Sequence, residues 1–472
     1  MMGSPFALEC GLGAVLLVVF VAGLLARSED RRFVGWLATL GILALALVSL
    51  CLAPVQSPPG AMFVQDGLAL FAKRLFLAAT FIGLLAGLSL PGAPFARRAL
   101  EYHVLILTSL LGMLVLASAR DIILLFVAFE LMSIPLYVLA GFVKRDEAAG
   151  ESALKFFLVG SVSSAVMAYG LSFVYGATGT SGLGGVAKAV GSGDSLLLLG
   201  LLLAFAGFGF KIAAFPFHMW APDTYEAAST PFVAWLSVAP KAAGFVAILR
   251  VYVEGVGDRI AWLVPVAAGL AALTIVAGNL MALPQQNAKR LLAYSGIAHI
   301  GYMLIGLAAA SASGTAMMLF YLVAYVFGNM GAFLVVEAVY RAEGSENVSA
   351  FSGLAQRSPV LALSMLLFLL SLGGIPFVAG FWAKLYVFWA AAEQGLYWLV
   401  LLGAVLTVVA LFYYLLVAKR MYVDAPARPE RVPLTPTLAL ALALCVAGIV
   451  VIGVYPKPVV MAALRVAGQL YQ

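Results

Sequence analysis

Charged residues are scarce in this chain. Only 10% of its 472 residues are Asp, Glu, Lys or Arg and 64% are apolar, which gives a mean hydropathy of +1.08. Soluble domains usually carry about 25% charged residues. No polar stretch between the apolar runs is long enough to form a soluble domain, which excludes a nucleotide-binding domain. We therefore expect an all-α integral membrane protein.

Cysteine and histidine are also rare. Cys10, Cys51 and Cys445 lie singly in apolar runs, where we expect small buried side chains. Iron–sulfur and zinc sites need closely spaced ligands, and neither the cysteines nor the three histidines have such spacing. Residues 182–187 fit the dinucleotide pattern G-x-G-x-x-A, but no βαβ unit surrounds them, so we interpret them as a flexible loop. We expect neither a metal site nor a cofactor in this chain.

Apolar runs follow one another from end to end. A helix of roughly 20 residues crosses the hydrocarbon core of a bilayer, which is about 30 Å thick. The sequence predicts fourteen spans, at 6–26, 32–54, 67–90, 100–118, 121–142, 151–176, 195–216, 230–254, 259–283, 288–310, 314–340, 359–389, 396–421 and 434–455.

The basic residues are distributed unevenly between the loops. The even-numbered loops hold Arg120, Lys188, Arg250 and Arg259, and the odd-numbered loops hold Arg27, Arg31, Arg32, Arg97, Arg98, Lys144, Arg145, Lys289, Arg290, Arg341, Arg357, Lys419, Arg420, Arg428 and Arg431. Cytoplasmic loops are enriched in Lys and Arg. We therefore expect both termini to face outward, into the periplasm in a Gram-negative bacterium. This arrangement accounts for the net charge of +6, so we expect no nucleic-acid partner.

The chain contains an internal repeat. The seventh and twelfth spans both break at a Pro-Phe pair, Pro216-Phe217 and Pro376-Phe377, which are 160 residues apart. The same shift aligns the fourth span with the ninth, the sixth with the eleventh and approximately the eighth with the thirteenth. Tandem copies of an odd number of helices cross the membrane in opposite directions, which gives an inverted-topology repeat. We expect helices 1–3 in residues 1–99, two five-helix repeats in 100–258 and 259–421, and helix 14 in 422–472.

Four ionisable residues lie about two turns or more inside predicted spans: Glu130, Lys211, Lys241 and Lys384. A central Lys or Asp costs roughly 2.5–3.5 kcal/mol in a membrane helix, so such residues are usually functional. Burial lowers the proton affinity of Lys and raises that of Glu, which lets both exchange protons near neutral pH, whereas Arg stays charged. We expect these four residues to form a proton relay.

Helix breaks give two of these lysines access to water. Lys211 lies five residues before Pro216, and Lys384 lies eight residues after Pro376. Proline frees backbone carbonyls, which are tolerated at membrane depth only against protein or water. Glu130 is the natural partner of Lys211. The alternative for both lysines is that they extend to the headgroups, an interpretation we prefer for Lys73 and Arg74 of the third span, whose charges lie nearer a loop.

Two further residues are candidates for the relay. Lys155 lies one turn from Glu151, so it either joins the relay near Glu130 or forms an ordinary i,i+4 pair. His299 lies within the tenth span and titrates near neutral pH unless a hydrogen bond fixes it. His103 begins a helix, and His218 follows the first break.

Four segments resemble a known family. They are 129–135 (FELMSIP), 211–223 (KIAAFPFHMWAPD), the Lys241 segment after Thr230-Pro231, and 290–302 (RLLAYSGIAHIGY). Together they resemble the antiporter-like membrane subunits of respiratory complex I over nearly the whole chain. The family has several members, which include the N, M and L branches. In residues 373–384 (GGIPFVAGFWAK), Lys384 stands where the M and L branches carry Glu or a differently placed Lys. This resembles the N branch, as does the lack of the long amphipathic C-terminal helix of the L branch.

The resemblance implies a function. Such subunits translocate protons outward in the membrane arm of NADH:quinone oxidoreductase, driven by quinone reduction in other chains, which also hold the flavin, the iron–sulfur clusters and the NADH and quinone sites. By the family pattern, Glu130 and Lys211 form the inner-side pair, Lys241 the central connection and Lys384 the second half-channel. Lys155 and His299 match positions on the same polar axis.

The implied partners are the neighbouring M subunit, the small subunits beside it, protons and the lipid of a bacterial inner membrane. Three alternatives stay open. The chain could be an Mrp-type cation/proton antiporter, a membrane subunit of a related hydrogenase or dehydrogenase complex, or a structural spacer that conducts no protons.

Overall fold

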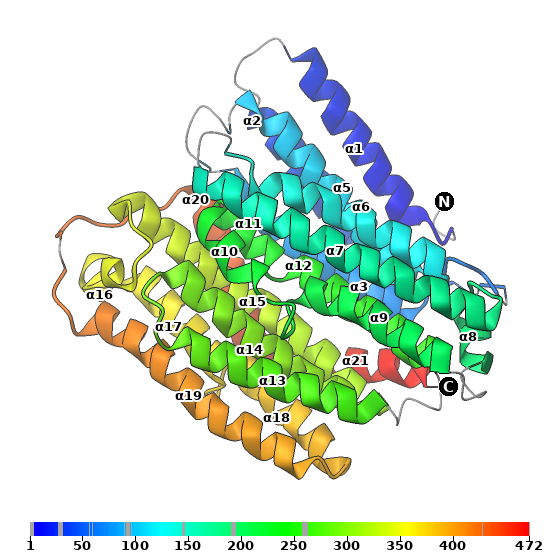
Figure 1. Cartoon of the computed structure of the whole chain (residues 1–472). Coiled ribbons are helices and arrows are strands. Elements are labelled where there is room, and N and C mark those ends of the chain that lie inside the picture. The colour runs from blue at the N-terminus through cyan, green and yellow to red at the C-terminus, as the bar shows by residue number, and fades with distance from the viewer. Residues whose placement is uncertain are drawn as a thin grey trace. The chain divides into compact units, whose positions relative to one another are not determined.

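A computed structural model provides the structure of the chain (Figure 1). It describes residues 4–26, 32–55, 57–58, 60–88, 90, 95, 97–143, 147–189, 195–256, 263–426 and 428–471. Within these ranges all regular structure is helical, apart from four isolated β-bridges. In the part of the chain that the structure describes, thirteen helical segments are long and apolar enough to cross a membrane, which confirms the all-α membrane class. Of the basic loop residues, Arg27, Arg31, Lys144, Arg145 and Arg259 lie outside the described residues.

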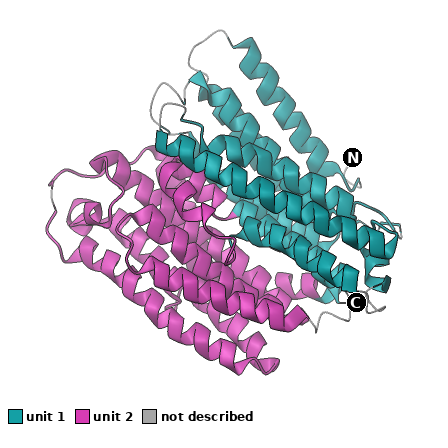
Figure 2. Cartoon of the chain, in the orientation of Figure 1, with its two compact units in different colours: residues 1–213, 239–262, 468–472 teal, residues 214–238, 263–467 magenta. Residues whose placement is uncertain are grey.

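The helices form two compact units (Figure 2). Unit 1 comprises residues 1–213, 239–262 and 468–472. Its helices are α1 (Ala7–Leu25), α2 (Arg32–Cys51), α3 (Gly67–Gly87), α5 (Ala99–Ser118), α6 (Ile122–Ala140), α7 (Glu147–Thr178), α8 (Leu183–Ala189), α9 (Ser195–Ile212), α12 (Ala239–Leu249) and the π-helix η2 (Arg250–Glu254). Helix α12 is buried along its length and packs against α3, α5 and α9.

Unit 2 comprises residues 214–238 and 263–467. Its helices are α10 (Trp220–Ala227), α11 (Thr230–Leu236), α13 (Val264–Ala282), α14 (Ala288–Ala308), α15 (Ala312–Glu343), the 3-10 helix η4 (Val348–Phe351), α16 (Leu354–Arg357), α17 (Pro359–Gly373), α18 (Ala379–Glu393), α19 (Tyr397–Tyr422), α20 (Pro436–Val454) and α21 (Lys457–Leu470). Helices α14 and α15 form its core and pack against each other, with α13, α18 and α20 around them. Residues 214–238, which the repeat assigns to its first copy, pack with unit 2.

Matching features recur in the two units. Asp121 caps α6 by accepting from the backbone N–H groups of the first turn, and Asn287 caps α14 in the same way, 166 residues later. Helices α7 and α15 both have 32 residues and begin 165 residues apart. The Pro-Phe pairs are therefore 160 residues apart, whereas the matching features of the helices before them are 165 or 166 residues apart.

Glycine brings one helix pair in each unit into backbone contact. A methyl group added at Gly112 of α5 would lie 2.7 Å from the Cα of Met132 in α6, and one at Gly278 of α13 would lie 2.8 Å from the Cα of Ala298 in α14. Small residues at such positions let membrane helices approach closely, so dispersion forces replace the hydrophobic effect that lipid cannot supply. The same packing device thus fixes α6 and α14 in their units.

Both expected helix breaks are present. Helix α9 ends before Ala213, whose φ is +60°, and α10 begins after Pro216 at Trp220. Helix α17 ends before Gly374, whose φ is +80°, and α18 begins after Pro376. The twelfth expected span is therefore the two half-helices α17 and α18, each shorter than a full membrane span.

Several expectations about single residues were wrong. Arg250, which we placed in a loop, is fully buried in η2. Residues 183–187 belong to the short helix α8 instead of a flexible loop. Cys10 and Cys51 are exposed on apolar helices, whereas Cys445 is buried as expected. Lys73 does not extend to the headgroups, because it is buried and pairs with Glu9 at 2.7 Å.

Candidate functional site

Lys211 is buried at the first break. It lies in the last turn of α9 and is 2% exposed. Its Nζ donates a hydrogen bond to Ser133 Oγ at 2.7 Å and lies 5.4 Å from the centre of the Phe129 ring. The Ser133 hydroxyl in turn donates to the Phe129 carbonyl at 2.6 Å. A cation in the last turn of a helix is favoured by the helix dipole, so α9 helps to hold this charge away from water.

Glu130 shares the face of α6 that carries Ser133, since the two residues are three apart. Its carboxylate accepts a hydrogen bond from the hydroxyl of Ser164 in α7 and interacts electrostatically with Lys211. Glu130 itself is only half-buried. The structure thus brings Glu130 and Lys211 together, with a neutral serine as the direct hydrogen-bond partner of the lysine.

Lys241 lies near the start of α12 and is 1% exposed. Gly244, one turn further on the same face of α12, packs against the side-chain stem of Lys211. A methyl group at Gly244 would lie 3.4 Å from Lys211 Cγ and 2.8 Å from Ile212 Cγ2. The structure therefore places the helix of Lys241 against the end of α9 that carries Lys211.

Lys384 is buried at the second break and is 4% exposed. It lies on α18, and its Nζ reaches back across the break to the carbonyl of Gly373, the last residue of α17, at 3.4 Å. The ammonium also lies 4.7 Å from the centre of the Tyr302 ring. The negative end of the α17 dipole and the face of the aromatic ring both stabilise a cation here.

His299 lies in a cluster of tyrosines in unit 2. Its Nδ1 is 2.8 Å from the hydroxyl of Tyr321, and its Nε2 is 3.3 Å from the hydroxyl of Tyr414. The Tyr414 hydroxyl also shares a hydrogen bond with Ser295. The Tyr302 ring, which packs on Lys384, lies 6.1 Å from the imidazole ring. His299 and Lys384 thus belong to one polar region of unit 2.

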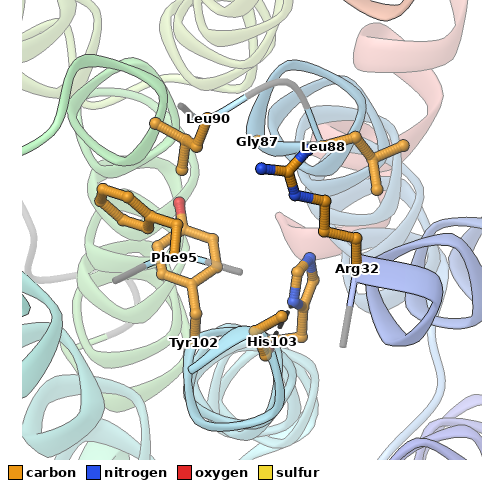
Figure 3. A pocket seen from close by; sticks show the side chains of 8 residues that line it. Arg32, Gly87, Leu88, Leu90, Phe95, Tyr102 and His103 are labelled. Carbon is orange, nitrogen blue, oxygen red and sulfur yellow. Dashed lines mark hydrogen bonds between the residues drawn. The ribbon is translucent and has the colours of Figure 1, made fainter. Parts of the chain in front are cut away.

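The remaining candidates lie apart from these groups. Lys155 is on an exposed face of α7, where it is 50% exposed and pairs with Glu151 at 2.8 Å. His103 lines a small pocket with Arg32, Tyr102 and other residues, and its Nδ1 is hydrogen-bonded to the carbonyl of Ala99 at 2.6 Å (Figure 3). Among the described residues, no group of three or more His, Cys, Asp or Glu side chains could hold a metal ion.

Sequence reasoning missed the hydroxyl groups of these sites. Ser133, Ser164, Tyr321 and Tyr414 are unremarkable in an apolar helix, because serine and tyrosine are common there. The spacing of Ser133, three residues after Glu130, is the one signal that could have identified it, since it places both side chains on one face. The tyrosines come from α15 and α19, which only the fold brings to His299.

An ionic cluster in unit 1 was also missed. The guanidinium of Arg250 donates to both Asp66 oxygens, at 2.6 and 2.7 Å, to Glu254 and to the carbonyl of Ala117. Burial alone would raise the pKa of Asp66, but the charge and hydrogen bonds of Arg250 outweigh it and hold this pKa below its ordinary value. Asp66 also caps α3, so the cluster fixes the start of that helix.

Two helical units with matching elements, each with a buried lysine at a broken helix, define a polytopic membrane protein of the ion-translocating class. A family model described as NADH:quinone oxidoreductase/Mrp antiporter, TM, matches residues 119–410. The chain belongs to this family.

Known relatives agree with this assignment. The NADH-quinone oxidoreductase subunit N of Moorella thermoacetica is 40% identical over 465 residues, which cover 98% of this chain and 96% of the relative. A chain of respiratory complex I from Thermus thermophilus is 33% identical, with a TM-score of 0.82 over 96% of this chain and 98% of that one. A chain of the Mrp complex from Dietzia sp. has a TM-score of 0.90, covers 99% of this chain and 98% of that one, and is 20% identical, so it shows the fold alone.

Proposed function

We propose that this chain is a proton-translocating N-type membrane subunit of an NADH:quinone oxidoreductase. The observation that carries the proposal is the surroundings of Lys211. This lysine is buried at a helix break, and its hydrogen-bond partner is a neutral serine. A buried lysine without a tight ion pair can lose its proton at moderate cost. The identity of 40% to a subunit N over nearly the full length supports this complex over other members of the family.

Each charged group has a role in the proposed relay. Lys211 carries the proton in unit 1, and Glu130 tunes its proton affinity through charge, with Ser133 holding the ammonium in place. Lys241 connects this pair with the rest of the chain, and Lys384 and His299 carry the proton in unit 2. Lys155, which is exposed and paired with Glu151, joins the relay only where a neighbouring subunit covers that face of α7.

The proposed setting follows from the family. The chain lies in a bacterial inner membrane with both termini outward, beside an M-type subunit and the small subunits next to it. Flavin, iron–sulfur clusters and the quinone site belong to other subunits. A reporter that is active only in the cytoplasm, fused after Gln472, should be silent, and strong activity would overturn the orientation.

Removal of Lys211 tests the function. In an assembled complex, Lys211→Ala should abolish most of the proton uptake into inverted vesicles that accompanies NADH oxidation. Lys188→Ala changes an exposed lysine of α8 and is the matched control. Full proton uptake per NADH in the Lys211→Ala complex would leave the chain as a structural spacer.

An Mrp-type antiporter is the second candidate, because the Mrp chain has the same fold. Purification of the tagged chain in mild detergent separates the two. A complex I subunit should purify with NADH-oxidising and quinone-reducing partners. An antiporter should purify without them and should exchange sodium for protons in vesicles.

A further inference from the structure

A cavity of about 520 Å³ lies at one end of unit 2. It is lined by the loop after α13, the start of η4 with the residue before it, and the last turns of α19. Polar side chains from all three elements line it: Gln285, Gln286, Asn347, Ser349 and Arg420. At roughly 30 Å³ per water molecule, the volume is large enough for on the order of ten waters.

The inner wall of this cavity includes Tyr413, which is 1% exposed. The Tyr413 hydroxyl donates to Asn279 Oδ1 at 3.1 Å, and the Asn279 amide donates to the carbonyl of Ile275 at 2.8 Å. The amide does not relay protons itself, but these two bonds fix the orientation of the tyrosine hydroxyl. Tyr413 is therefore a rigid, polar point of contact between the cavity and the helix core.

Beyond Tyr413 the polar groups continue to the second site. The rings of Tyr413 and Tyr414 lie 4.6 Å apart. The Tyr414 hydroxyl contacts Ser295 and His299, and His299 contacts Tyr321. A hydroxyl can accept one proton while it donates another, so a row of hydroxyls and an imidazole is suited to proton transfer.

We propose that this cavity is the port through which His299 and Lys384 exchange protons with water. Tyr413 and Tyr414 are the relay residues between the cavity and His299. The inference rests on the proposed proton-translocating function. The helix ends at this end of unit 2 carry Lys289 and Arg290 (α14), Arg341 (α15) and Lys419 and Arg420 (α19), and by the positive-inside rule they face the cytoplasm. The port therefore opens to the cytoplasm.

Loss of one hydroxyl tests the relay. Tyr413→Phe keeps the ring and removes the group that bonds Asn279. We expect a several-fold loss of proton uptake per NADH in inverted vesicles, with normal assembly of the complex. Tyr422→Phe makes the same chemical change on an exposed residue of α19 and should have no effect. Unchanged uptake in the Tyr413→Phe complex would remove this tyrosine from the relay.

Reversible blocking of the cavity separates transport from folding. Ser349 lines the cavity and is exposed, so Ser349→Cys provides an attachment point. A bulky, membrane-impermeant methanethiosulfonate reagent should lower proton uptake in inverted vesicles, and dithiothreitol should restore it. The unsubstituted complex treated with the same reagent controls for other cysteines. The same reagent added to right-side-out vesicles should leave proton release unaffected. Inhibition in right-side-out vesicles alone would mean that the cavity opens to the outer side of the membrane, which would overturn the proposal.

The two proposals fail in different ways. If Lys211→Ala abolishes uptake while Tyr413→Phe and the blocked Ser349→Cys complex pump normally, the port is wrong and the proposed function stands. If Lys211→Ala pumps normally as well, the proposed function is wrong.

Discussion

The two units stabilise a buried lysine in different ways. In unit 1, Lys211 lies in the last turn of α9 and donates a hydrogen bond to Ser133, with the carboxylate of Glu130 on the same face of α6. In unit 2, Lys384 lies beyond the break and binds the carbonyl end of α17 and the ring of Tyr302. Lys211 thus has a carboxylate nearby whose charge can change with protonation. Lys384 instead has a helix dipole and an aromatic ring, whose electrostatic effects do not change with protonation.

The shared packing makes this difference informative. The caps of α6 and α14 are 166 residues apart, and the same offset carries Ser133 to His299. The residue that touches Lys211 in unit 1 is therefore replaced in unit 2 by an imidazole within a tyrosine cluster. We infer that proton affinity is set by a nearby charge in unit 1 and by a hydrogen-bond network in unit 2.

The largest effect is expected at Glu130. Glu130→Gln removes the charge that, in the proposed relay, tunes Lys211, so it should abolish most of the proton uptake, whereas Glu130→Asp keeps the charge and should retain a substantial part of the uptake. The measurement is proton uptake per NADH oxidised by matched amounts of assembled complex. Equal and full uptake in both variants would show that unit 1 does not depend on this carboxylate.

A smaller effect is expected at Gly374, which touches the lysine of unit 2. A methyl group here would lie 2.9 Å from Lys384 Cδ, and the φ of +80° adds strain of about 1–2 kcal/mol for any other residue. Gly374→Ala should displace Lys384 and lower proton uptake. Gly395→Ala is the matched control, because Gly395 has a φ of +75° and no atom lies within 4 Å of the position that an added Cβ would take. Equal losses in both variants would assign the effect to backbone strain alone.

The smallest effect is expected at Ser133. Ser133→Ala removes one hydrogen bond to the buried ammonium, worth about 1 kcal/mol net or a factor of roughly five in an equilibrium. The pH dependence of proton uptake should shift modestly, with assembly unchanged. Ser172→Ala, which removes an exposed hydroxyl of α7, provides the baseline. A loss as large as that of Glu130→Gln would mean that hydrogen bonding, and not charge, controls Lys211.

Much of the fold could be predicted from the sequence, because apolar runs of span length and proline breaks are local signals. The buried lysines were also predictable, since a charge in such a run stands out. Arg250 was misplaced because it lies near the end of its apolar run, and its partner Asp66 is 184 residues away in the sequence. The tyrosines around His299 could not be identified, because no local pattern links α14, α15 and α19.

The offset of the repeat illustrates the same limit. The Pro-Phe pairs gave 160 residues, since they are the most visible shared feature, but the caps and long helices show 165 to 166. The correspondence of Ser133 with His299 depends on the larger offset. Only helix boundaries and caps, which sequence patterns locate poorly, could reveal it.

The central claim is that Lys211 releases its proton in every cycle, and Lys211→Arg tests this most directly. Arginine keeps the positive charge and approximate length but does not deprotonate near neutral pH. Assembly is checked first by native gel and by electron transfer from NADH to an artificial acceptor. Proton uptake into inverted vesicles is then compared with Lys211→Ala. We predict that the arginine variant fails about as severely as the alanine variant. Near-normal pumping by an assembled Lys211→Arg complex would contradict the account and leave Lys211 as a fixed charge.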